Sequence, residues 1–195
     1  MKYTICAAAL GVLLLTGCTA ADSPAPSPSV PSAGAVSTID RALTAEELGR
    51  DETTKLDAAG DSFSAVLHVG QGYSLYIPDD GWTLALRDDS DIPRDCWTAD
   101  ALEGVSLSIY HYADMSSGVA RSRFLDSCGY VFEDLSGGET DDPLYGQNGA
   151  GSTMGLAVEE STNGTTYVIA WEYPAEGEAY RPILDAVAGS FELME

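Results

Sequence analysis

The sequence predicts an α+β domain, in which helices pack on an antiparallel β-sheet. Several stretches alternate apolar and polar residues with a period of two, which is typical of strands with one buried face. The clearest pair, 152–160 and 165–173, is joined through Asn163-Gly164, a residue pair that type I′ hairpin turns select. Two other segments repeat their apolar residues at helical spacing. Strand pairs interrupted by such helices predict a sheet with a helical layer.

An earlier pair of strands, 73–77 and 82–86, flanks Pro78-Asp79-Asp80-Gly81. Proline presets one backbone angle of a turn, aspartate bonds its own backbone, and glycine accepts a positive φ. We therefore expect another hairpin, in which the acids form the turn and have no catalytic role. Trp82 falls in the apolar phase of its strand and is expected in the core. A third strand is predicted over 105–110.

A helix is predicted to begin at Ser116 or Ser117, either of which can cap it. Its inward residues are expected to be Val119, Ala120, Phe124, Leu125 and Cys128. A strand over 130–135 and a glycine-rich loop over 136–151 follow. The chain closes with a helix that begins near Glu178, because Pro182 is tolerated only in a first turn. Gly189 is expected just after its end.

Residues 1–17 have the pattern of a signal peptide. Lys2 precedes an apolar run that is too short for a membrane span. The run ends in Leu15-Thr16-Gly17-Cys18, which resembles the lipobox of bacterial lipoproteins. That resemblance implies cleavage before Cys18 and attachment of lipid to its thiol, so we expect an anchored protein on the extracytoplasmic face of the cell membrane. The alternative is an ordinary secretory signal with an incidental cysteine.

The remainder of the chain divides by composition into three parts. Residues 18–38 are rich in proline, serine and alanine and are expected to form an extended tether. Residues 39–62 are acidic, and the capping-box spacing of Thr44 and Glu47 predicts a short helix there. Residues 63–195 are expected to form a single α+β domain.

Charge and cysteine content narrow the classes of partner. A formal net charge of −22 argues against nucleic acid as a partner, since nucleic-acid binding requires basic surfaces. Two cysteines, Cys96 and Cys128, lie beyond the lipobox. Outside the cytoplasm they are predicted to form a disulfide, with two free thiols or part of a metal site as the alternatives.

The sequence contains no recognisable catalytic constellation and implies no cofactor. His68 and His111 are interpreted as structural histidines on strands, because neither is spaced for a catalytic pair or a metal site. The acidic stretch of Asp88, Asp89, Asp91 and Asp95 offers weak candidates for Ca²⁺ ligands, although it lacks the EF-hand register. These acids and Trp97 are interpreted as a loop, and Trp97 is the candidate contact residue for a glycan or a protein, although core packing is the favoured interpretation.

Three stretches resemble the PsbP-like domain family: GYSLYIPDDGW, a late strand ending in WEYP, and a closing helix that runs into SFEL. The resemblance covers 63–195 and implies an α/β/α sandwich with no catalytic residue. We therefore expect a lipid-anchored, non-enzymatic protein that binds another protein or an envelope component. A module for small ligands, glycans or Ca²⁺ is the alternative, and a cell-envelope hydrolase is a more distant one.

Overall fold

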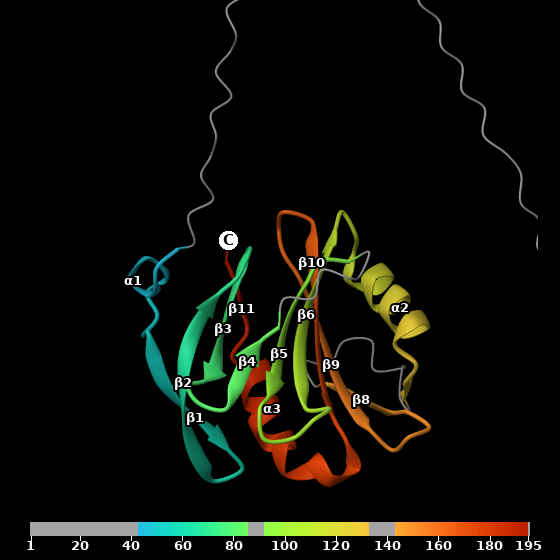
Figure 1. Ribbon diagram of the computed structural model, residues 1–195. Coiled ribbons are helices and arrows are strands. Elements are labelled where there is room, and N and C mark those ends of the chain that lie inside the picture. The colour runs from blue at the N-terminus through green and yellow to red at the C-terminus, as the bar shows by residue number, and fades with distance from the viewer. Residues whose placement is uncertain (1–42, 86–91, 133–142, 195) are drawn as a thin grey trace, which may run out of the picture. The chain divides into compact units, whose positions relative to one another are not determined.

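The computed structural model describes residues 43–85, 92–132 and 143–194 of the 195-residue chain. Two antiparallel sheets and several helices confirm the α+β class (Figure 1). The four-stranded sheet has the order β1-β2-β3-β11, and the seven-stranded sheet has the order β4-β5-β6-β10-β9-β8-β7. The described helices are α1 (Ala45–Leu48), α2 (Ser117–Cys128) and α3 (Arg181–Ala188), with a 3₁₀ helix, η1, over Ala175–Tyr180. The strands are β1 (Thr53–Ala58), β2 (Asp61–Val69), β3 (Tyr73–Pro78), β4 (Trp82–Leu84), β5 (Arg94–Ala99), β6 (Ser106–Ala113), β7 (Val131–Phe132), β8 (Leu144–Gln147), β9 (Thr153–Glu160), β10 (Thr165–Tyr173) and β11 (Glu192–Leu193).

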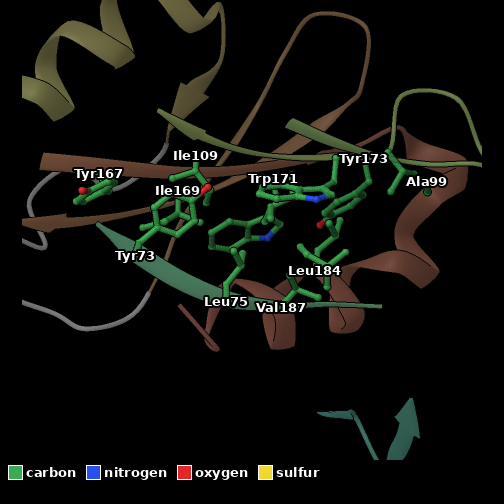
Figure 2. Close-up of a cluster of buried hydrophobic side chains, with 14 residues drawn as sticks. Tyr73, Leu75, Ala99, Ile109, Tyr167, Ile169, Trp171, Tyr173, Leu184 and Val187 are labelled. Atoms are coloured by element: carbon green, nitrogen blue, oxygen red, sulfur yellow. The ribbon is translucent and has the colours of Figure 1, made fainter. Parts of the chain in front are cut away.

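The central strand β10 supplies a separate hydrophobic core on each face of the large sheet. Every second side chain of β10 points into the first core, which also contains residues of β3 and α3. The β10 residues in this core are Tyr167, Ile169, Trp171 and Tyr173 (Figure 2). Val168 and Ala170 point to the opposite face and pack under α2 in the second core. The helices follow the same division, since α2 packs against β10 and β9, and α3 against β1, β3 and β10. The period-two pattern of the sequence therefore places both layers.

The predicted hairpin around Pro78-Asp79-Asp80-Gly81 is wrong. β3 pairs with β2 and β11 in the small sheet, whereas β4 pairs with β5 in the large one. The turn residues behave as expected, because Gly81 adopts a φ of 73°. A turn fixes only the reversal of the chain, and here each strand is paired by another segment. Trp82 packs against the first core, as expected.

The sheet begins before Phe63, where the sequence placed the start of the domain. β1 pairs along its whole length with β2, from Thr53 opposite Val66 to Ala58 opposite Asp61. The capping box that precedes it is present: the Glu47 amide donates to the Thr44 hydroxyl, and the Thr44 amide donates to the Glu47 carboxylate. Lys55 and Asp57 face solvent on β1, so the acidic composition conceals a half-exposed edge strand.

The Arg50 side chain ties this N-terminal segment to the rest of the small sheet. Its guanidinium donates to the Ser74 hydroxyl at 2.8 Å and to the Ser190 carbonyl at 3.1 Å. It also lies 4.5 Å from the centre of the Tyr76 ring. The contacts join residues that are far apart in sequence and hold β3 against the C-terminal segment.

The β9–β10 hairpin forms as predicted but with a longer turn than type I′. Thr166 lies opposite Glu160, and the Ser161 amide donates to the Thr165 carbonyl. Only Gly164 has a positive φ, of 85°, whereas a type I′ turn requires two such residues. The Asn163 side chain instead accepts a hydrogen bond from the Thr165 amide at 2.9 Å.

The predicted helices are present, with differences at their surfaces and ends. In α2, Ala120 and Phe124 are buried as expected, but Val119 is 56% exposed. The closing helix begins as η1 before α3, with Pro182 in the first turn of α3. Gly189 ends it in a right-handed conformation, with a φ of −67°. β8 occupies part of the predicted 136–151 loop. Of the predicted 130–135 strand, residues 130–132 are described, and β7 covers the last two of them.

Candidate functional site

Two adjoining hollows border α2 and the seven-stranded sheet, and together we name them the α2 groove. The first has a volume of about 510 Å³ and the second about 560 Å³, sizes typical of pockets for small molecules. They share Ile92, Tyr112 and Arg123. The first is further lined by Tyr110, Phe124, Ser127, Cys128, Tyr130, Met154 and Glu172, and the second by Gln71, Gly72, Pro93, His111, Ala113, Met115, Asn163, Thr165 and Tyr167.

Tyr112 is the residue of the α2 groove whose polar atom the protein leaves unsatisfied. Its side chain is 2% exposed and belongs to the second core. No group among the described residues forms a hydrogen bond with its buried hydroxyl. Burial raises the pKa of this hydroxyl, with the neighbouring Tyr110 adding to the rise and Arg123 opposing it. Tyr112 is therefore a neutral donor without an acceptor.

Arg123 contributes a positive charge to the same part of the groove. It stands on the exposed flank of α2, one residue before the buried Phe124, which anchors the helix to the sheet. Arg123 and Tyr112 both line each of the two hollows. No ion pair of Arg123 is present in the described parts of the chain. The lining of the groove thus includes both a hydroxyl and a guanidinium.

The other end of the first hollow is acidic. The Tyr130 hydroxyl donates a hydrogen bond to the Glu172 carboxylate. Burial, followed by the contact with Glu172, raises the pKa of Tyr130 above its ordinary value. The Phe124 ring lies between the two ends, edge-on to Tyr110 at 5.1 Å. The groove is therefore polar at its ends, with opposite character, and aromatic between them.

Tyr110 is fixed by the neighbouring strand β5. Arg94, directly opposite it in the register, donates a hydrogen bond of 2.7 Å to the Tyr110 hydroxyl. The Arg94 Nε atom is buried without a partner among the described residues. The aromatic middle of the groove is thus rigid, because both α2 and β5 hold its central ring.

A second polar cluster lies on the opposite face of the large sheet, around Asp95. The Asp95 carboxylate accepts a hydrogen bond from the Tyr73 hydroxyl, and its Oδ2 lies 3.6 Å from His111 Nε2. Contact with His111 is the main cause that lowers the pKa of Asp95, against the effect of burial. Burial lowers the pKa of His68, whose ring stands edge-on to Trp97 at 4.8 Å. His111 also lines the second hollow, so this cluster adjoins the groove.

Of the four candidate Ca²⁺ ligands, only Asp95 lies within the described residues, so the prediction of a Ca²⁺ site stays untested. Asp88, Asp89 and Asp91 lie outside the described residues. Asp95 lies on β5, where its carboxylate is engaged by Tyr73 and His111. Within the described ranges, no group of three or more histidine, cysteine, aspartate or glutamate side chains is placed to hold a metal ion.

Trp97 is not exposed as a contact residue, and core packing, the favoured interpretation, is confirmed. Trp97 lies on β5 and is only 4% exposed, within the first core. Sequence reasoning treated 88–97 as a loop, because its acids concealed the strand. Pairing with β6, where Trp97 lies opposite Leu107, turns the indole inward.

The predicted disulfide between Cys96 and Cys128 is also absent, and both thiols are free. Cys96 lies on β5, whereas Cys128 ends α2, which packs over β10 and β9. In the sheet order, β6 separates β5 from β10. Adjacent strands are about 4.8 Å apart, so two strand spacings exceed the usual Cα separation of a disulfide.

The sequence offered little indication of Tyr112 and Arg123. The stretch SLSIYHYA has large residues in both phases, which is the only sign that β6 is covered on both faces. An arginine on the flank of a helix has no distinguishing pattern. The hydroxyl without a partner becomes visible only when β6 and α2 are assembled.

Comparisons with known proteins concern the fold. No protein-family model matches the chain, and no curated protein matches it. The solution structure of cyanobacterial PsbP (CyanoP) from Synechocystis sp. PCC 6803 is similar over 73% of this chain and 93% of that one, with 11% identity and a TM-score of 0.45. A crystal structure from Bacteroides thetaiotaomicron VPI-5482 is similar over 64% of this chain, with 14% identity and a TM-score of 0.40. The match spans 46% of that second protein.

Proposed function

We propose that this chain is a membrane-anchored extracytoplasmic lipoprotein of PsbP-like fold, whose domain binds a component of the cell envelope in the α2 groove without catalysis. The observation that carries the proposal is that Tyr112 lines both hollows, while its buried hydroxyl has no partner among the described residues. A buried polar group without a partner lowers stability, so its retention favours a role in binding.

The lipobox Leu15-Thr16-Gly17-Cys18 supports the anchor, and the following 18–38 segment supports a tether. Two or more acyl chains on Cys18 would hold the protein stably, whereas one chain gives only marginal binding. No helix in the described part of the chain is long and apolar enough to cross a membrane. The groove would then face components that lie within reach of the tether.

The surroundings of His111 support a role without catalysis. Nucleophilic catalysis requires a hydroxyl or thiol activated by a nearby base. The hydroxyls that line the second hollow within the described residues belong to Tyr112, Thr165 and Tyr167. The Tyr73 hydroxyl, which is next to Asp95, already donates to that carboxylate. This arrangement suits a structural ion pair better than a nucleophile with its base.

The anchor is tested by replacing the lipobox cysteine. Cys18→Ser should abolish incorporation of labelled palmitate and release the protein from the membrane fraction. Cys6→Ser, inside the predicted signal peptide, is the matched control and should change neither. Palmitate incorporation in the Cys18→Ser protein would contradict the proposed anchor.

Binding in the groove is tested by crosslinking in native membranes. Ser127 lines the first hollow on the exposed side of α2, so Ser127→Trp should fill the groove without disturbing the core. Ser122→Trp, on the same helix but outside the lining, is the control. We expect one envelope component to crosslink to the wild type and to Ser122→Trp, and to be lost with Ser127→Trp. Equal capture by all three proteins, or capture of nothing above a tether-only control, would contradict the proposal.

A further inference from the structure

We propose that the α2 groove recognises an oxyanion, the carboxylate or phosphate oxygens of an amphiphilic ligand, held between the Tyr112 hydroxyl and the Arg123 guanidinium. The apolar part of the ligand would lie along Phe124 and Met154. This inference rests on the proposed function and specifies the chemistry of its ligand.

The Tyr112 hydroxyl is a buried hydrogen-bond donor. Because burial raises its pKa, the hydroxyl keeps its proton throughout the physiological range and acts as a donor. A donor enclosed at 2% exposure requires an acceptor, and the described residues provide none. An acceptor from outside the described residues, such as an oxygen of a bound ligand, would satisfy this donor.

Arg123 supplies the other donor group of the proposed oxyanion site. A guanidinium presents several donors and accepts no hydrogen bond, so the exposed side chain of Arg123 is suited to bind an anionic acceptor. A carboxylate or phosphate oxygen can accept from both Tyr112 and Arg123, and its negative charge makes these hydrogen bonds stronger than those to a neutral oxygen. The acidic charge of the whole chain does not prevent this, because charges more than about 8 Å away are largely screened at physiological salt.

The charges at the two ends of the groove determine the orientation of the ligand. The far end of the groove already contains the Glu172 carboxylate, which accepts a hydrogen bond from the Tyr130 hydroxyl. An anion placed there would be repelled, whereas the end formed by Tyr112 and Arg123 would attract it. Phe124, together with Met154, which lies opposite Glu172 in the register, offers an apolar wall. The groove therefore selects a molecule with one acidic end and an apolar body.

The test uses the lipidated full chain in nanodiscs and three probes that share one body. The probes are 4-phenylbutyrate, 4-phenylbutyl phosphate and the neutral 4-phenylbutanol, and their affinities are measured by titration calorimetry with empty nanodiscs as the blank. At least one anion should bind the wild type about tenfold or more tightly than the alcohol, since a hydrogen bond to a charged group exceeds one between neutral groups. The stronger of the two anions distinguishes a phosphate source from a carboxylate source.

Matched variants assign the effect to the two donors. Tyr112→Phe and Arg123→Gln should each remove about tenfold or more of the anion affinity while leaving the affinity for the alcohol unchanged. Tyr76→Phe and Arg121→Gln, which lie outside the groove lining, should bind the anions as the wild type does. Equal affinity for anions and alcohol, with no effect of Tyr112→Phe, would contradict recognition of an oxyanion. The groove would then still bind ligands, but without the proposed specificity. Failure of all three probes to bind would overturn the groove itself and with it the proposed function.

Discussion

The Tyr73 hydroxyl donates a hydrogen bond to the Asp95 carboxylate and thereby joins the two sheets. Tyr73 lies on β3 of the small sheet, and Asp95 lies on β5 of the large one. The Tyr73 ring is completely buried, stacked on Phe191 at 5.3 Å and edge-on to Tyr167 at 5.6 Å. Since β3 does not pair with the large sheet, this contact and the first core hold the two together.

We expect Tyr73→Phe to destabilise the protein by about 1.5–3 kcal/mol, the usual contribution of a hydrogen bond to a charged group. The change keeps the ring and removes only the donor to Asp95. Tyr76→Phe is the control, because the Tyr76 hydroxyl donates to the neutral backbone carbonyl of Asp51 at 2.9 Å. Loss of this hydrogen bond should lower the free energy of unfolding by about 1 kcal/mol. Urea denaturation of the three proteins measures the difference, and a smaller loss for Tyr73→Phe than for Tyr76→Phe would contradict the expectation.

Asp95 should contribute to the loss of stability in acid. Contact with His111, opposed by burial, lowers the pKa of Asp95 below its ordinary value of 3.8. A depressed carboxylate pKa stabilises the folded state above the unfolded value, and this contribution is lost as the pH falls through the folded value. Asp95→Asn should therefore be less stable than the wild type at pH 6 and lose less stability between pH 5 and pH 2.5. Parallel curves of the free energy of unfolding against pH would contradict this.

His68 should make the protein less stable as the medium becomes mildly acidic. Burial lowers the pKa of His68 below 6.5, although Asp95 opposes the shift. The unfolded chain then binds the proton more readily than the folded one, so stability falls as the pH drops from 6.5 through the folded value. His68→Gln should flatten the curve in this range, and measurements near pH 8 provide the reference. An unchanged slope below pH 6.5 would show that His68 does not cause it.

Gly155 is required by the close approach of Trp171 on the neighbouring strand. The two residues lie directly opposite each other, and a Cβ at Gly155 would be 2.1 Å from Trp171 Cε2. Gly155→Ala should therefore displace an indole whose Nε1 donates to Asp185 at 2.9 Å, at a cost of about 1–3 kcal/mol. Gly149→Ala, where a Cβ meets no heavy atom within 4 Å, should stay within about 0.5 kcal/mol of the wild type. Thermal unfolding compares them, and equal effects would contradict the packing argument.

The sequence predicted elements better than their pairing. Periodicity located β6, β9, β10 and α2, because each buries a regular face against the sheet or a helix. It could not show that β3 and β4 belong to different sheets, since a turn such as Pro78 to Gly81 specifies a reversal and not the partners. It also missed β1 and β5, whose acidic and polar residues face outward or form pairs inside the protein.

The candidate site was less accessible to sequence reasoning than the fold. Trp97 and Asp95 attracted attention because a tryptophan among acids is an unusual combination, yet pairing with β6 places Trp97 in the core. Tyr112 looked like one aromatic residue among many. What distinguishes it is a missing hydrogen bond, which depends on every neighbour of its hydroxyl in the folded chain. No pattern of residue types along the sequence contains that information.

Tyr112 and Tyr167 should respond oppositely to loss of the hydroxyl. Both are 2% exposed and lie on the adjacent strands β6 and β10. Among the described residues, only the Tyr167 hydroxyl of the two has a partner, the Gln71 carbonyl at 2.9 Å. Tyr167→Phe should cost about 1 kcal/mol, because it removes that bond and leaves the carbonyl unsatisfied. Tyr112→Phe should leave the free energy of unfolding of the unliganded protein unchanged or increase it, since it removes a buried hydroxyl without a partner.

Urea denaturation of the unliganded full chain measures both changes against the wild type. A gain in stability that accompanies a loss of ligand affinity is the expected signature of a residue retained for binding. Equal destabilisation by Tyr112→Phe and Tyr167→Phe would show that the Tyr112 hydroxyl is satisfied in the folded protein. In that case the groove would lose the donor on which its proposed specificity depends.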